Sequence, residues 1–155
     1  MAAPSVEELN GWITGFDALY GLRLVAHSEE EVRAQVRICD HHRQPAGLVH
    51  GGLFAAIAES TASLATALAV MGDGATAVGL SNATSFMRPI TEGTVHALAR
   101  RRHRGRTTWL WDVEISDDDG RLCALTRMTI AVRPAPPAAA ATGAAAGADA
   151  DSQGQ

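Results

Sequence analysis

The chain has 155 residues, of which 46% are hydrophobic, and its formal net charge at pH 7 is −4. This length suits one domain with a sizeable core, and the hydrophobic content excludes a chain that is disordered throughout. The negative charge argues against general binding to nucleic acids.

The sequence carries no signal for export or membrane insertion. Its first eight residues lack the basic start and apolar run of a signal peptide. The longest apolar stretch contains Glu59 and several hydroxyl residues, so we expect no membrane span. Cys39 and Cys123 offer neither a disulfide framework nor a metal-ligand spacing, and we expect reduced thiols in a cytoplasmic protein.

The predicted elements begin with a helix that starts near Ser5 and continues at helical spacing to about Gly21. Strands are expected over 22–26 and, with clear alternation, over 31–38. A long loop over 39–49 leads into a helix that ends near Met71. Four further strands are predicted over 76–86, 93–102, 107–116 and 122–133, and their short connections favour antiparallel pairing. Residues 134–155 are almost entirely Ala, Gly, Pro and small polar residues, so we expect a domain over 1–133 and a disordered tail over 134–155.

The loop before the long helix and the helix itself hold the candidate chemistry. Gly51 and Gly52 at the helix start leave amide N–H groups uncovered, and these can stabilise a developing negative charge. Glu59 follows two turns later as the one acid in an uncharged run; a solvated surface residue is the plain alternative. At 100° per residue the helix has an apolar stripe and an opposite face. The stripe holds Leu53, Ile57, Leu64 and Leu68, and the opposite face holds Glu59, Ser63, Thr66 and Val70.

The order of elements and several short motifs resemble the hotdog-fold acyl-CoA thioesterases. The motifs are GLVHGG at 47–52, AE at 58–59, SNATSF at 81–86, RP at 88–89, TTWLWDV at 107–113 and GRLCA at 120–124. The implied fold is α+β, an antiparallel sheet wrapped around a long central helix. The pattern is most similar to the 4-hydroxybenzoyl-CoA thioesterase branch that uses a helix glutamate. Phenylacetyl-CoA and 1,4-dihydroxy-2-naphthoyl-CoA thioesterases share much of it, so the motifs do not specify the acyl group.

The resemblance implies a role for each matched residue. Glu59 would be the catalytic nucleophile or general base, and the Gly51 amide would polarise the thioester carbonyl. Gln44 and His50 match polar residues beside the thioester, and Ser63 matches a hydroxyl that places the hydrolytic water. The remaining matched positions would bind the substrate or its coenzyme A part: Gly52, Asn82, Arg88, Arg106, Thr107 and Thr108.

The resemblance also implies an acyl-CoA substrate, degradation of aromatic compounds, and a homotetramer built as a dimer of dimers with sites between subunits. No metal, separate cofactor, nucleic acid or membrane partner is expected. His41, His42 and His50 lack the spaced Cys or acidic ligands of a metal site. Five arginines lie within 100–106 and suit either a solvated strand end or a phosphate cradle. Trp109 and Trp111 alternate in a strand and are expected in the core or a subunit interface.

Two other functions fit the same outline. A hotdog hydratase or dehydratase usually has an Asp/His pair before and at the start of the helix, whereas this helix offers Glu59 alone. A non-catalytic acyl-CoA sensor would use the same pocket. The presence of Glu59 together with Ser63 favours catalysis.

Overall fold

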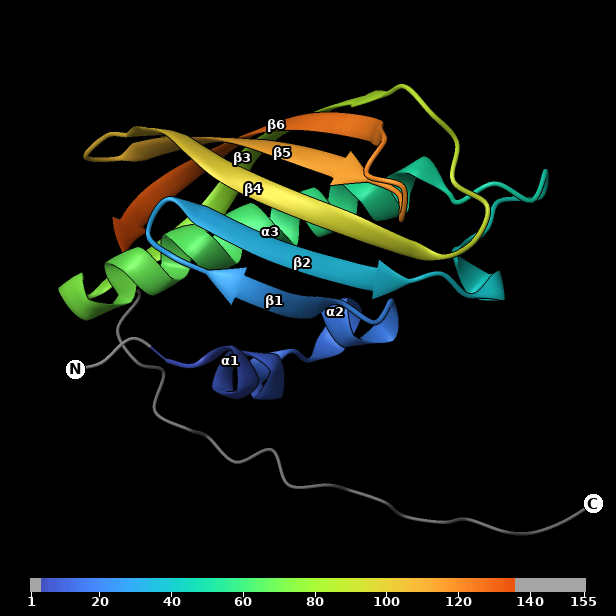
Figure 1. Cartoon of the computed structure of the whole chain (residues 1–155). Helices are drawn as coiled ribbons and strands as arrows, with labels where there is room; N and C mark the ends of the chain where they lie inside the picture. The colour runs from blue at the N-terminus through green and yellow to red at the C-terminus, as the bar shows by residue number, and fades with distance from the viewer. Residues whose placement is uncertain (1–3, 136–155) are drawn as a thin grey trace, which may run out of the picture.

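Six antiparallel strands form one sheet in the order β1-β2-β4-β5-β6-β3, and the sheet curls around the helix α3. In this computed structural model residues 4–135 are described. Figure 1 shows α3 lying against the inner face of the sheet, with α1 and α2 beside β1. This arrangement confirms the predicted hotdog fold. In chain order the elements are α1 (Val6–Trp12), α2 (Gly15–Leu19), β1 (Arg23–His27), β2 (Glu31–Arg37), η1 (Asp40–His42), α3 (Gly51–Val70), η2 (Met71–Asp73), β3 (Ala75–Phe86), β4 (Thr94–Arg104), β5 (Thr108–Ser116) and β6 (Leu122–Pro134).

The helix α3 is buried over more of its circumference than the predicted stripe. Thr66 and Val70, expected on the outer face with Glu59, are both buried. The prediction was wrong for these two residues because the curled sheet covers the helix from several sides. Thr66 is tolerated there because its hydroxyl donates to the Ala62 carbonyl and accepts the indole N–H of Trp111 at 2.9 Å. Trp109 and Trp111 are also buried, which confirms their place in the core.

By length and mean hydropathy alone, the stretch Gly51–Asp73 is apolar enough to cross a membrane. Half of the most apolar 18 residues of this stretch are buried inside the fold, against the sheet. A core helix that a sheet surrounds has the same composition as a membrane span, because both contact apolar surroundings.

The N-terminal segment differs from the prediction. Instead of one helix it forms α1 and α2, separated by extended backbone at Ile13 and Thr14. A capping box between Ser5 and Glu8 begins α1 as expected. Only Leu9 of the predicted apolar face is buried, and the side chains of Trp12, Phe16 and Leu19 are more than half exposed.

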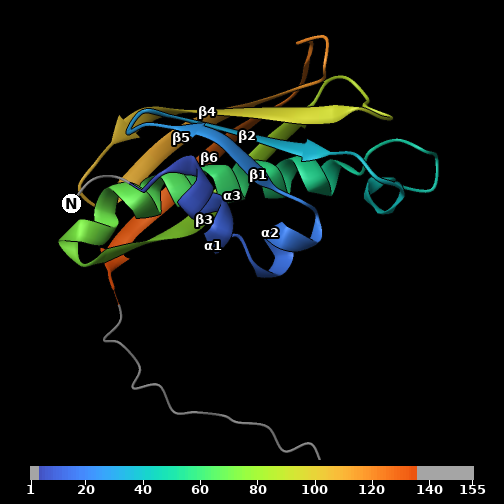
Figure 2. The same cartoon turned by 60° about the horizontal axis from the view of Figure 1, so that its bottom comes forward.

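The later strands match the predicted ranges to within two residues. The strand β6 extends to Pro134, which pairs with Ala75, so the predicted domain boundary after residue 133 falls inside this strand. The rest of the predicted tail, residues 136–155, lies outside the described residues. Figure 2 shows α1 and α2 on the side of the sheet that carries α3.

The strand β3 is a twelve-residue edge strand of the sheet. It pairs with β6 on one side only, and Val78, Leu80 and Phe86 on it are each at least half exposed. A long edge with exposed apolar side chains is suited to pair with another strand.

Candidate active site

The start of α3 presents one backbone donor that the fold does not use. His50 is the N-cap residue, and its Nδ1 accepts the Gly52 N–H at 2.9 Å. The His50 backbone N–H is itself bound to the His42 carbonyl. Within residues 4–135 the Gly51 N–H has no hydrogen-bond partner. The positive end of the helix dipole therefore coincides with a free amide donor at Gly51.

Gly52 has a structural role in this cap. A β-carbon at Gly52 would lie 2.9 Å from His50 Nδ1, closer than such contacts allow. Any other residue would therefore push the imidazole away from the position in which it caps the helix. The N–H of Gly52, which the resemblance places in substrate binding, is used in this cap.

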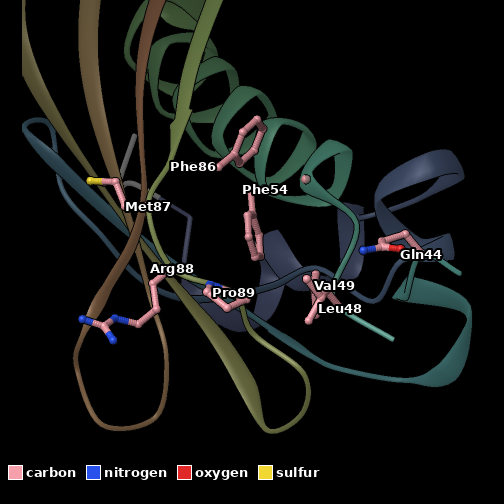
Figure 3. Close-up of a pocket in the computed structure, with 9 residues that line it drawn as sticks. Gln44, Leu48, Val49, Phe54, Phe86, Met87, Arg88 and Pro89 are labelled. Carbon is pink, nitrogen blue, oxygen red and sulfur yellow. The ribbon is translucent and has the colours of Figure 1, made fainter. Parts of the chain in front are cut away.

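The Gly51 backbone lies at the wall of a cavity of about 460 Å³. The cavity lies between the start of α3, the loop before it and the end of β3. Figure 3 shows the ring of Phe54 pointing into it with Phe86 beside it, while the Arg88 side chain reaches away from both rings. Its lining is mostly apolar and consists of Gln44, Leu48, Val49, Gly51, Phe54, Phe86, Met87, Arg88 and Pro89. A mostly apolar cavity with a few polar groups is typical of a small-molecule site.

Gln44 supplies a second donor to this cavity. Its Oε1 accepts the Ala46 N–H at 2.6 Å, which fixes the orientation of the side-chain amide. The Nε2 group has no partner among the residues described and remains available as a donor. The structure thus brings Gln44, His50 and Gly51 to the same end of α3.

Glu59 and Ser63 lie further along the same helix. Eight residues separate Gly51 from Glu59, so the two are about 12 Å apart along the axis. Glu59 is exposed, and a β-carbon at Gly79 of β3 would lie 3.4 Å from its Oε1. The Ser63 hydroxyl is half-buried one turn later and forms no hydrogen bond within residues 4–135. The structure therefore places Gly51 and Glu59 at different heights along α3.

The predicted coenzyme A residues divide between the two ends of the sheet. Arg88 follows β3, where Phe86 pairs with Ala124, and it lines the cavity. Thr108 pairs with Ala131 near the opposite end, where β3 begins, and Arg106 and Thr107 precede it in the β4–β5 turn. The structure therefore does not bring these three residues to the cavity of their own chain. Asn82 lies between the two ends, and its amide donates to the Ala55 carbonyl of α3 at 2.9 Å.

Four of the five clustered arginines form ion pairs with carboxylates of the sheet or of the turn between β1 and β2. Arg100, Arg101, Arg102 and Arg104 form ion pairs with carboxylates, and Arg101 and Arg104 also lie over the Trp109 ring. Asp112 accepts from both Arg102 and Arg127, and these guanidinium groups hold the pKa of its carboxyl below the ordinary value. Arg88 and Arg106 form no ion pair within the described ranges. Of Arg88 and the arginines of 100–106, only Arg88 and Arg106 are therefore left without a carboxylate partner among the described residues, and these two are available to bind a phosphate group.

Two polar clusters near the site were not predicted. Tyr20 Oη donates to Asp17 Oδ1 at 2.8 Å, and Ser60 Oγ of α3 donates to the same oxygen at 2.6 Å. Burial raises the pKa of Tyr20, which keeps it a neutral donor. This cluster fixes α2 to α3 beside Glu59. Its members are far apart in sequence and are common residue types, so no motif signals it.

The second cluster lies in the loop before α3 and consists of the buried His42 with the backbone N–H groups of Cys39 and His50. His42 is 6% exposed; its Nδ1 accepts the Cys39 N–H at 3.0 Å, and its carbonyl accepts the His50 N–H. Its Nε2 is buried without a hydrogen-bond partner in the described part of the chain. Burial lowers the pKa of His42, and the neighbouring His41 and Arg43 act in the same direction. In residues 4–135 no three His, Cys, Asp or Glu side chains form a group that could hold a metal ion.

Comparison with known proteins identifies the family. The model of the thioesterase superfamily matches residues 46–124. An esterase of Pseudomonas aeruginosa, PA1618, is 37% identical over 84% of this chain and 91% of its own length. A crystal structure of that protein, described as a mutant thioesterase, has a TM-score of 0.81 and covers 86% of this chain and 96% of that chain at 36% identity. A proofreading thioesterase, EntH, of Cronobacter turicensis is 32% identical over 72% of this chain and 81% of its length. The chain therefore belongs to the thioesterase superfamily and is a hotdog-fold thioester hydrolase.

Proposed function

We propose that the protein hydrolyses an aromatic acyl-CoA, of the 4-hydroxybenzoyl-CoA kind, to the free acid and coenzyme A. The observation that carries this proposal is the free Gly51 N–H at the start of α3, in the wall of an apolar cavity. The two phenyl rings of the cavity favour an aromatic acyl group over a small aliphatic one. Phenylacetyl-CoA and 1,4-dihydroxy-2-naphthoyl-CoA are the alternative substrates.

The chemistry needs a polarised carbonyl, an attacking group and a leaving thiolate. The Gly51 N–H polarises the carbonyl, with the Gln44 amide as a second donor; one such donor contributes about 10²–10³ in rate. Glu59 either attacks the carbonyl to form an anhydride that water opens, or removes a proton from water that Ser63 orients. In both routes the C–S bond breaks and coenzyme A leaves as the thiolate.

Two chains are needed to complete this site. The rise of about 12 Å between the Gly51 and Glu59 backbones along one helix supports a site that two chains share. Gly51 lies against Phe86, and Glu59 lies over Gly79, both on the edge strand β3. If two β3 strands pair antiparallel about an axis at Ala83, Phe86 of one copy lies opposite Leu80, beside Gly79, of the other. Each Gly51 then meets the Glu59 of the partner subunit. Two such dimers make the proposed homotetramer.

The binding of coenzyme A is assigned to Arg88 first. It lines the cavity, reaches away from the aromatic rings and has no ion pair within residues 4–135. A guanidinium group pairs well with the phosphates of the nucleotide. Arg106, Thr107 and Thr108 lie at the other end of the sheet and would contribute only from another subunit.

Hydrolysis of benzoyl-CoA and 4-hydroxybenzoyl-CoA, followed with a thiol reagent, tests the proposal. We expect turnover by the wild-type protein, and a loss of at least about 10³ in kcat for Glu59→Gln, the scale of losing a primary catalytic group. Binding of acyl-CoA without turnover by the wild type would instead identify a sensor.

A further inference from the structure

Phe86 occupies an unusual position for a large apolar side chain. It is the last residue of β3 and is 58% exposed. Its ring nevertheless packs on the start of α3. The contact is so close that a β-carbon at Gly51 would lie 2.9 Å from Cε1 and 3.0 Å from Cζ of the ring. The ring therefore lies directly against the residue that carries the free amide.

The ring of Phe86 also faces a second aromatic side chain. The centroid of Phe54, which is 3% exposed, lies 6.4 Å from that of Phe86, and the planes are inclined by 38°. Phe54 belongs to the buried core, whereas Phe86 is the last residue of β3 and lies at the surface of the described chain. Figure 3 shows the two rings side by side at the start of α3, so the cavity has one buried and one exposed aromatic side chain.

We infer that Phe86 is a specificity-determining residue that contacts the acyl group and selects for an aromatic ring. This inference rests on the proposed function, since it takes the acyl group to lie beside the Gly51 amide. An acyl carbonyl bound to that amide has its substituent next to the Phe86 ring. A planar aromatic substituent can pack on Phe86 and Phe54 in offset or edge-to-face geometry, which a flexible alkyl chain cannot reproduce.

The position of Gly51 follows from the same contact. A larger residue at 51 would displace the Phe86 ring, even where the backbone amide was retained. Gly51 therefore serves two purposes, because it supplies the donor and it leaves room for the ring that selects the substrate.

The test compares Phe86→Ala and Phe86→Leu with wild type on benzoyl-CoA and hexanoyl-CoA. We expect kcat/KM for benzoyl-CoA to fall by about tenfold in Phe86→Ala, as for other losses of apolar pocket contacts, with less than about a threefold change for hexanoyl-CoA. Phe86→Leu keeps apolar volume without the ring and should show the same change of preference. Leu125→Ala, which removes an exposed apolar side chain of β6 outside the cavity, is the matched control and should change neither value.

Binding of a non-hydrolysable thioether analogue separates this inference from the proposed function. We expect the ratio of Kd for S-phenacyl-CoA to that for S-hexyl-CoA to rise in Phe86→Ala, whether or not the wild type shows turnover. The role of Phe86 would be overturned if Phe86→Ala lowered kcat/KM equally for benzoyl-CoA and hexanoyl-CoA. It would also be overturned if the ratio of the two kcat/KM values and the ratio of the two Kd values both stayed as in wild type. If the Kd ratio changes in Phe86→Ala but the wild type hydrolyses neither thioester, only the proposed thioesterase activity is refuted, and the role of Phe86 stands.

Discussion

Gly51 and Glu59 are the two residues on which the proposed chemistry depends. The helix cap uses the Gly52 N–H and leaves the Gly51 N–H free, and this difference arises from the His50 side chain. The carboxylate of Glu59 lies on exposed surface, so the substrate and a second chain can approach it. Both residues could be singled out from the sequence, because they are a glycine at a helix start and a lone acid in an uncharged run.

Replacing Arg88 should weaken binding of coenzyme A more than it slows chemistry. Arg88→Ala removes a free guanidinium beside the cavity, so we expect KM for acyl-CoA to rise about tenfold with a smaller change in kcat. A thioester of N-acetylcysteamine, which lacks the nucleotide, should be affected less. Arg102→Ala is the charge-matched control, since Arg102 is paired with Asp112 on the sheet. Equal losses on both thioesters would indicate a structural role for Arg88.

The elements of the fold were predicted where their pattern had a single interpretation. Alternation over β2 and the four later strands, closed by Gly, Pro or Asp clusters, placed them to within two residues. The break between α1 and α2 was missed because Trp12, Phe16 and Leu19 keep a helical spacing across it although they are exposed. The ion pairs of the arginine cluster were also missed, since their carboxylate partners lie elsewhere in the sequence, in the β1–β2 turn, in β2 and in β5.

The loop before α3 should make the stability of the protein depend on pH through His42. Burial lowers the pKa of His42 below the ordinary value of about 6.5, so the unfolded chain takes up this proton at higher pH than the folded one. The contribution of neutral His42 to the free energy of unfolding is therefore complete above about pH 6.5, and it declines as the pH falls. Protonation would also convert Nδ1 from an acceptor to a donor facing the Cys39 N–H.

His42→Asn tests this dependence, because its Oδ1 can accept the Cys39 N–H but does not titrate. We expect urea unfolding to show a smaller loss of stability between pH 7.5 and pH 5.5 in the variant than in wild type. An equal loss in both proteins would assign the pH dependence to other groups.

The edge strand β3 should form the dimer contact in one register. An axis at Ala83 brings the two Ala83 residues opposite each other, at the Cα separation of roughly 4.5–5.5 Å that a disulfide accepts. In a Cys39→Ser background, Ala83→Cys should therefore form a cross-linked dimer on oxidation. Ser85→Cys is the control, since its equivalent in the partner lies four residues out of register, or about 13 Å away. Cross-linking of Ser85→Cys but not Ala83→Cys would contradict this register.

At the scale of the whole molecule, the sequence predicted the correct fold, but not where one chain places the candidate site residues. Gln44, His50 and Gly51 lie together, whereas Glu59 lies along the helix and Arg106 to Thr108 lie at the far end of the sheet. If these residues act together across two subunits, as we propose, they leave no spacing pattern in a single chain. The geometry of α3 supplies this information, because its rise per residue fixes how far apart Gly51 and Glu59 must be.

Complementation between two inactive variants tests the shared site most directly. Glu59→Gln lacks the carboxylate. Gly51→Pro lacks the amide donor and also displaces the Phe86 ring of its own chain, so both changes affect the half of the site that this chain supplies. Proline suits the first helical position, and the extended His50 can precede it. Each variant alone should be inactive on benzoyl-CoA. When the two are co-expressed with different tags, half of the dimers are mixed and each mixed dimer has one intact site, so we expect about a quarter of wild-type activity. No recovery of activity in purified mixed dimers would contradict a site built from the Gly51 of one chain and the Glu59 of its partner.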